Sequence, residues 1–212
     1  MTTDTARSAL GRFLGVAVDP QTYRNLAYLL LAFPLGIVYF TVFWGGGAAG
    51  LATVPILVGV PVLVALLAVA TTLADLESRL AAGLLGADVS AGATRPGDET
   101  LGEYVQRIAL DPRSYLAVGY LLSKFVIGLV AFVALVTSAT LSATLVLAPA
   151  LYQRPGIAYQ FGARSVETLP VALGLSVTGV LLALVSLHLL NGAAWLVGEY
   201  TEVMLGSGER DD

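Results

Sequence analysis

The amino-acid sequence predicts an all-α integral membrane protein with four transmembrane helices arranged as two repeated hairpins, accompanied by short interfacial amphipathic helices. Three observations predict this fold. Of the 212 residues, 57% are hydrophobic and only 12% are charged, whereas soluble domains carry about 25% charged residues. Three long stretches, 25–74, 125–153 and 168–198, contain no Asp, Glu, Lys or Arg. The two halves of the chain also align with each other, which indicates an internal repeat.

The stretch 25–74 is long enough for two membrane crossings. A helix rises about 1.5 Å per residue, so about 20 residues span the roughly 30 Å hydrocarbon core. We expect Gly45, Gly46 and Gly47 to form the turn between the two helices. The spacing Gly45-x-Gly47-x-x-Gly50 also matches a dinucleotide-binding fingerprint, but no strand precedes it and no acid follows about 20 residues later. A turn is therefore the preferred interpretation.

The second half supplies the third and fourth crossings. By alignment with the first half, the third helix spans about 118–136, although its apolar character continues to Leu151. A single helix over 114–148 would be about 50 Å long, so it must tilt, kink or project from the bilayer. Its segment 137–144 is rich in small and hydroxyl residues, which allow close helix packing in lipid. The fourth helix begins near Thr168.

The internal repeat appears when the chain is shifted by 92 residues, which places Asp19-Pro20 on Asp111-Pro112. At the far end 84–86 matches 204–206, now shifted by 120, so the second copy is longer. Two crossings per copy predict parallel copies related by a pseudo-twofold axis along the membrane normal. Thr100 and Glu103 have the spacing of a capping box and start the amphipathic helix of the second copy. Further matched pairs are Thr22 and Ser114, Tyr23 and Tyr115, Tyr28 and Tyr120, Phe33 and Phe125, Gly36 and Gly128, and Phe40 and Phe132.

The predicted domain boundaries follow from this alignment. The first repeat covers 1–86, a cytoplasmic linker covers 87–99, the second repeat covers 100–206, and an acidic tail covers 207–212. The second repeat contains an enlarged outer segment, 137–169, whose loop runs over 149–169.

Charge predicts the orientation and excludes several classes of protein. Arg7, Arg12, Arg24 and Arg79 flank the first hairpin, so the positive-inside rule places both termini in the cytoplasm of a multi-pass cell-membrane protein. The polar start of the chain predicts that the first helix is an uncleaved insertion signal. The net charge of −4 and the lack of a basic patch argue against a nucleic-acid partner. The absence of cysteine excludes disulfides and thiolate metal sites, and the acid-rich, Lys-poor segments suggest a salt-adapted, haloarchaeal-like host.

Three polar residues inside the predicted helices are candidate intramembrane site residues: Lys124, His188 and Asn191. An intramembrane charge such as Lys124 indicates function by default, with snorkelling or packing as the alternative. His188 and Asn191 share one helix face and are expected to form structural hydrogen bonds. A proton relay would need an acid at similar depth, and the sequence places none in the spans. A single His predicts no metal site.

The outer loop contains four candidate ligand-binding residues: Tyr152, Arg154, Tyr159 and Arg164. They form either an interfacial aromatic belt or a cup for an anionic or amphiphilic ligand, with the two arginines as donors. No nucleophile–base pair, carboxylate dyad or metal cluster can be assembled from the sequence. We therefore expect no catalytic residue, no cofactor and no enzymatic activity.

Several short motifs resemble the "putative sensor" domain family, which occurs at the N-terminus of many actinobacterial and haloarchaeal histidine kinases and also as free-standing membrane proteins. The resemblance covers nearly all of 12–206 and implies four spans in two pairs, a role in signal perception and no catalytic residues. The motifs are Tyr28-Leu29-Leu30-Leu31, Phe33-Pro34-Leu35-Gly36-Ile37-Val38-Tyr39-Phe40, Gly59-Val60-Pro61, Leu76-Glu77-Ser78-Arg79-Leu80, Leu84-Leu85-Gly86 and Asp111-Pro112.

The chain differs from the kinase relatives because it ends at Asp212 without a catalytic module. The sequence thus predicts a non-enzymatic sensor or signalling-accessory protein that perceives an external or in-membrane cue and acts through a separate partner. The expected partners are the lipid bilayer and another membrane or cytoplasmic signalling protein, with a homo-oligomer as a further option. The alternatives are a small transporter or channel subunit, or a structural membrane assembly partner.

Overall fold

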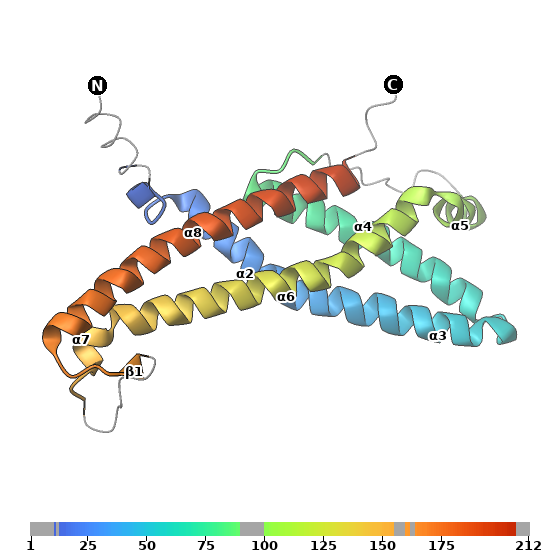
Figure 1. The fold of residues 1–212 in the computed structure, drawn as a ribbon. Coiled ribbons are helices and arrows are strands. Elements are labelled where there is room, and N and C mark those ends of the chain that lie inside the picture. The colour runs from blue at the N-terminus through green and yellow to red at the C-terminus, as the bar shows by residue number, and fades with distance from the viewer. Residues whose placement is uncertain (1–10, 12, 90–99, 155–159, 162–163, 207–212) are drawn as a thin grey trace. The chain divides into compact units, whose positions relative to one another are not determined.

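The computed structural model describes residues 11, 13–89, 100–154, 160–161 and 164–206. These residues are helical almost throughout, which confirms the predicted all-α class (Figure 1). The elements are α2 (Pro20–Phe40), the π-helical turn η1 (Thr41–Gly45), α3 (Gly46–Thr53), the 3-10 turn η2 (Val54–Ile56), α4 (Gly59–Leu85), α5 (Leu101–Leu110), α6 (Pro112–Val146), α7 (Ala148–Leu151), the strands β1 (Gln160–Phe161) and β2 (Arg164–Ser165), and α8 (Leu169–Leu205). The two short strands pair antiparallel.

Four helical segments are long and apolar enough to cross a membrane, as predicted. They are Pro20–Ile56, Gly59–Leu85, Pro112–Val146 and Leu169–Leu205. The third segment, α6, has 35 residues and is therefore about 53 Å long, so it continues well past the expected end near Val136. The described part of the chain is thus a four-span membrane protein.

The chain divides into two compact units, which are described separately below. Unit 1 contains Met1–Tyr23 and Val133–Gly192, and unit 2 contains Arg24–Phe132 and Ala193–Asp212. The core of unit 1 consists of Ala148, Val166 and Ala172. The larger core of unit 2 comes from α2, η1, α4 and α6 and consists of Tyr39, Phe43, Ala70, Ala74, Ala117, Tyr120 and Leu121.

The predicted turn at Gly45, Gly46 and Gly47 is wrong, because the helical run continues through these residues into α3 (Figure 1). Glycine acts here as a packing residue. A Cβ on Gly46 would lie 2.9 Å from a Leu66 methyl carbon, and one on Gly50 would lie 2.7 Å from a Leu63 methyl carbon. These two glycines are four residues apart and let α3 approach α4 closely, as small residues do between membrane helices.

The actual turn lies between η2 and α4. Pro55 is part of the 3-10 turn, and Leu57 adopts the left-handed conformation with φ of 63°. Leu57 is the only non-glycine residue with positive φ in the described part of the chain. Gly59 follows at the start of α4, where a Cβ would lie 2.1 Å from the Gly50 carbonyl oxygen. The turn therefore depends on one strained leucine and on one glycine in contact with backbone.

Within unit 2, α2 and α6 touch backbone to backbone at two glycines. A Cβ on Gly36 would lie 2.7 Å from the Phe125 Cα, and a Cβ on Gly128 would lie 2.4 Å from the Ala32 carbonyl oxygen. Neither position has room for a larger residue. We call this close contact the glycine crossing.

Two aromatic stacks flank the glycine crossing. The rings of Phe33 and Phe132 stack at 4.5 Å, and those of Phe40 and Phe125 stack at 4.7 Å. Adding 92 to Phe33 gives Phe125, and adding 92 to Phe40 gives Phe132, so each stack maps onto the other. The contacts at the glycine crossing are related in the same way, as expected for two copies about a pseudo-twofold axis.

Contacts at both ends of the proposed copies follow the same offsets. Tyr23 donates its hydroxyl to the Ala17 carbonyl at 2.6 Å, and Tyr115 donates to the Ala109 carbonyl at 2.8 Å. At the other end, a Cβ on Gly59 would lie 2.4 Å from the Val54 nitrogen, and one on Gly179 would lie 2.7 Å from the Val146 nitrogen. The tyrosines, the alanines and the valines of these contacts each differ by 92 residues between the two copies, and the glycines differ by 120. These are the two offsets of the sequence alignment. The duplication and its domain boundaries stay a prediction, which these contacts support.

The amphipathic helix of the second copy is α5, and it begins at the predicted capping box. The Glu103 backbone N–H donates to the Thr100 hydroxyl oxygen, and the Glu103 carboxylate accepts from the Thr100 backbone N–H at 2.9 Å. In the first copy, residues 11 and 13–15 are helical, whereas Arg7 and Arg12 lie outside the described residues. Most of the predicted linker and the predicted acidic tail also lie outside them.

Candidate functional site

A buried ion pair joins α4 to α6 inside unit 2. The Lys124 ammonium lies 3.1 Å from Oε2 of Glu77, and each residue is only 1% exposed. Removing two charges from water costs several kcal/mol per ion, so such a pair persists only where further hydrogen bonds satisfy both groups. The neighbouring side chains supply those bonds.

Tyrosines on α2 and α6 surround the ion pair. Tyr28 donates its hydroxyl to Oε2 of Glu77 at 3.1 Å, and Tyr39 donates to Oε1 at 2.9 Å, so both carboxylate oxygens have partners. Lys124 donates to the Tyr28 hydroxyl oxygen. Its ammonium also lies 4.8 Å and 5.0 Å from the ring centroids of Tyr28 and Tyr120, within the range of cation–π attraction.

The polar contacts continue to the end of α8. Thr201 donates its hydroxyl to the Val197 carbonyl at 2.8 Å, which leaves its oxygen to accept the Tyr120 hydroxyl at 3.0 Å. Beside it, Ser123 and Tyr200 are hydrogen-bonded at 2.8 Å. The site therefore contains residues of α2, α4, α6 and α8. We call its members the Glu77–Lys124 cluster: Tyr28, Tyr39, Glu77, Tyr120, Lys124 and Thr201.

The sequence interpretation missed Glu77. The uncharged stretch 25–74 ends before Asp75, so Glu77 was not counted within a span and no acid was found at the depth of Lys124. In the structure α4 continues to Leu85 and Glu77 points inward with Lys124, so Lys124 does not snorkel to the surface. One sequence signal could have identified Glu77, because it lies at helical spacing within an otherwise small-residue face. That buried face consists of Ala70, Ala74, Glu77, Ser78 and Ala81.

The other two candidate intramembrane residues lie in unit 1, where they hold the N-terminal segment. Asn191 donates its side-chain N–H to the Thr22 hydroxyl oxygen at 2.8 Å. The His188 ring stacks on Phe13 at 4.8 Å, and its Nδ1 is 2.8 Å from the Leu184 carbonyl oxygen. These contacts fit the expected structural hydrogen bonding. Lys124 belongs to unit 2, so each unit has its own buried polar contacts.

The candidate residues of the loop 149–169 are only partly described. Tyr152 packs on the small core of unit 1, and Arg154 is exposed. Arg164 lies in β2 opposite Phe161, and Tyr159 lies outside the described residues. The ligand cup therefore stays a prediction. Among the described residues, no group of three or more His, Cys, Asp or Glu could hold a metal ion.

The family model described as "Putative sensor" matches residues 28–205 of the chain. The chain belongs to the Putative sensor family. The match includes every member of the Glu77–Lys124 cluster, from Tyr28 to Thr201, and it agrees with the resemblance noted in the sequence. No curated protein and no solved structure matches the chain.

Proposed function

We propose that this member of the Putative sensor family is a non-enzymatic membrane sensor that signals through a separate cytoplasmic partner. The single observation that carries the proposal is the Glu77–Lys124 cluster, in which side chains from four helices surround one buried ion pair between α4 and α6. A cue that changes the packing of α2 against α4 and α6 would reach the end of α8 through this cluster.

A buried ion pair suits a two-state switch because separating its two charges costs a large free energy. Separating one partner leaves an uncompensated buried charge, at a cost of about 3–5 kcal/mol. A ligand needs about 5.5 kcal/mol of differential affinity to convert a 1:99 equilibrium into 99:1. A cue must therefore favour the state with the broken pair by an energy of this order before the change of state is nearly complete.

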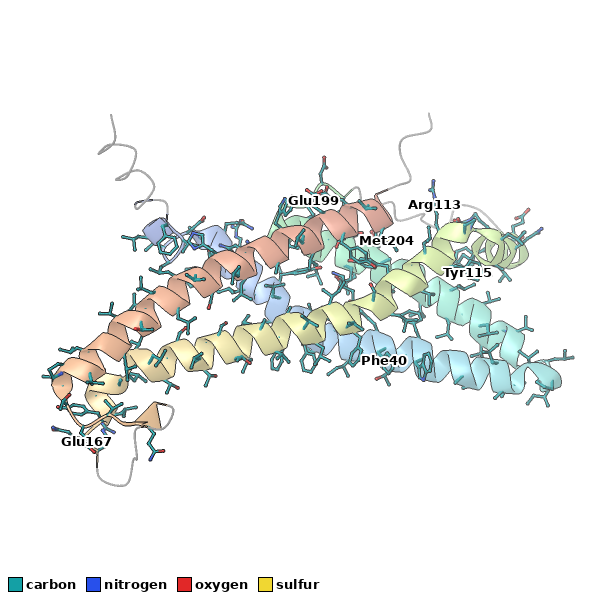
Figure 2. The ribbon with its side chains drawn as sticks, viewed as in Figure 1. Phe40, Arg113, Tyr115, Glu167, Glu199 and Met204 are labelled. Carbon is teal, nitrogen blue, oxygen red and sulfur yellow. The ribbon has the colours of Figure 1, made fainter. Side chains whose placement is uncertain are left out.

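The end of α8 is the proposed output surface. Thr201 lies four residues before the last residue of α8, Leu205. Glu199 on α8 and Arg113 on α6 project from their helices and are exposed (Figure 2). We place this surface in the cytoplasm by the positive-inside rule, where a signalling protein could contact it.

The proposal is tested by tagging the full chain in its native membrane and recovering bound proteins. Glu77→Gln and Lys124→Met should change the recovery of a specific partner several-fold, because each breaks the ion pair. Asp75→Asn is the matched control on the same helix, since Asp75 pairs with Arg79, whose side chain is 64% exposed. Equal recovery from all four proteins would contradict the proposal.

A small transporter or channel subunit is the second candidate. The observation that favours it is an acid and a base buried together within candidate spans, because such residues often mark proton or ion pathways. Proton or cation flux into vesicles containing the full chain, lost in Glu77→Gln but retained in Asp75→Asn, would select this function instead.

A further inference from the structure

The helices offer more apolar length than a bilayer needs. Large apolar side chains are exposed along the first span from Leu30 to Ile56, a distance of about 40 Å at 1.5 Å per residue. The hydrocarbon core is only about 30 Å thick, and a span that exceeds it tilts. Covering 40 Å within 30 Å requires a tilt of about 40°, the upper end of the usual range.

At such tilts the angle of the helix depends strongly on bilayer thickness. Natural membranes vary from about 27 to about 33 Å, and over this range a 40 Å apolar length changes its tilt by about 13°. Helix α2, which begins the first span, therefore adjusts its angle when the acyl chains change in length.

The glycine crossing gives α2 and α6 a point about which that angle can change. At Gly36 and Gly128 the two backbones are in direct contact, so no long side chain locks one helix to the other there. The flanking Phe33–Phe132 and Phe40–Phe125 stacks consist of flat rings that can slide on each other.

Tyr28 lies to one side of this contact point, whereas the Lys124 backbone lies at it, with its carbonyl oxygen 2.9 Å from a Cβ on Gly36. Tyr28 is eight residues, or about 12 Å, from Gly36 along α2. A change of about 10° in the angle between α2 and α6 moves groups at this distance by about 2 Å. That displacement exceeds the tolerance of a hydrogen bond, so Tyr28 could not keep its contacts with both Glu77 and Lys124.

We infer that the cue is the thickness of the bilayer, set by lipid acyl-chain length and converted by the glycine crossing into the state of the Glu77–Lys124 cluster. This inference rests on the proposed sensor function and names its cue. The recognised partner is the lipid itself, through the exposed apolar length of the spans.

The experiment uses the full chain, which contains no cysteine, so that two introduced cysteines are the only labelling sites. Ala27→Cys and Gly119→Cys are exposed positions on α2 and α6, each nine residues before its crossing glycine. The labelled protein is placed in phosphatidylcholine bilayers with 14-, 18- or 22-carbon monounsaturated chains, and the distance between the two spin labels is measured by pulsed electron paramagnetic resonance.

We expect the label distance to change steadily by about 2 Å or more across the lipid series, following the geometry of the crossing. A control pair within one helix, Val60→Cys and Val69→Cys on α4, should show a constant distance. Gly36→Ala places a Cβ against the Phe125 backbone and should reduce the lipid dependence, whereas Gly174→Ala meets no neighbour and should not. If Gly36→Ala does not fold, the label distances measured across the three lipids in the protein with Gly36 intact still test the inference.

A label distance that is the same in all three lipids would overturn the inference. If that constant distance then shifted when native membrane extract was added, bilayer thickness would be excluded while the sensor function stood. A constant distance under both conditions, together with unchanged partner recovery from Glu77→Gln, would remove the inference and the proposed function together.

Discussion

The ammonium of Lys124 contacts Oε2 of Glu77 at 3.1 Å, and Oε1 of the same carboxylate accepts the hydroxyl of Tyr39. The carboxylate therefore holds both α2 and α6 to α4, and Oε2 also accepts the Tyr28 hydroxyl of α2. Loss of the charge on either partner affects three helices at once, which makes this pair the most informative place for substitutions.

Glu77→Gln or Lys124→Met alone should lower the free energy of unfolding by about 3–5 kcal/mol, because each leaves its partner as an unpaired buried charge. The double variant Glu77→Leu with Lys124→Met should recover part of this loss, since an apolar pair carries no charge-desolvation cost, although the Tyr28 and Tyr39 hydroxyls lose the carboxylate as their acceptor. Thermal unfolding in detergent micelles measures both effects. A double variant that is less stable than either single variant would contradict the role assigned to the pair.

Gly59→Ala should destabilise the first hairpin, because its Cβ would lie 2.1 Å from the Gly50 carbonyl oxygen and force α3 away from α4. We expect a loss of about 2 kcal/mol or more, as for other overpacked contacts. Gly83→Ala is the matched control on the same helix: it meets no neighbour and should gain up to about 1 kcal/mol from helix propensity. Equal unfolding temperatures for the two variants would argue against the close α3–α4 contact.

Leu57→Gly should stabilise the hairpin by about 1 kcal/mol, because glycine adopts φ of 63° without the penalty that a side chain incurs. Little packing is lost, since Leu57 is 80% exposed. Val58→Gly, at φ of −77°, is the control and should not stabilise. Denaturation of both variants in micelles checks the prediction, and a gain for Val58→Gly alone would show that the turn lies elsewhere.

Glu103 should make α5 sensitive to acid. Hydrogen bonds from the Thr100 backbone N–H and hydroxyl hold the pKa of the Glu103 carboxyl below its usual value. The capping contribution is therefore complete above the unfolded pKa of about 4.3 and is lost as the pH falls through the lower folded pKa. Carboxyl NMR titration of Glu103 should show the low pKa in the unaltered chain and a smaller lowering in Thr100→Ala, which loses the hydroxyl donor but keeps the backbone N–H donor. The same titration midpoint in both proteins would contradict the capping box.

Asn191→Leu should detach the N-terminal segment of unit 1, because it removes the donor to the buried Thr22 hydroxyl. Hydrogen bonds between membrane helices contribute about 1 kcal/mol, so we expect a loss of that size. In Thr22→Val the same bond is already absent, and adding Asn191→Leu should then cost much less. A double-mutant cycle with no coupling between the two positions would show that the bond is not formed.

The sequence predicted the four spans because uninterrupted apolar length is a direct requirement of the bilayer. It misplaced the first turn because glycine has two uses. In water, three consecutive glycines favour a turn, whereas in lipid the same residues let helices approach, as Gly46 does against Leu66. The turn that forms instead uses Leu57, whose positive φ no propensity rule would assign to leucine.

The sequence predicted one of the two charged residues of the candidate site. Lys124 was identified because a charge inside a span is rare, but its partner was not, because Glu77 lies near the end of α4 among other charged residues. Which of Asp75, Glu77 and Arg79 faces inward depends on how far α4 continues as a helix and on its rotation. Local sequence does not specify that rotation. It is set by contacts with Tyr39 and Lys124, which are distant in the chain.

The ion pair also sets a condition on how the protein is made. Translation runs from the N-terminus, so Glu77 is synthesised 47 residues before Lys124, and its carboxylate is made before its counterion. The first hairpin therefore cannot complete its packing until α6 arrives. Although the halves resemble duplicated modules, each contains only one of the two charges, so neither half is expected to mature when expressed alone.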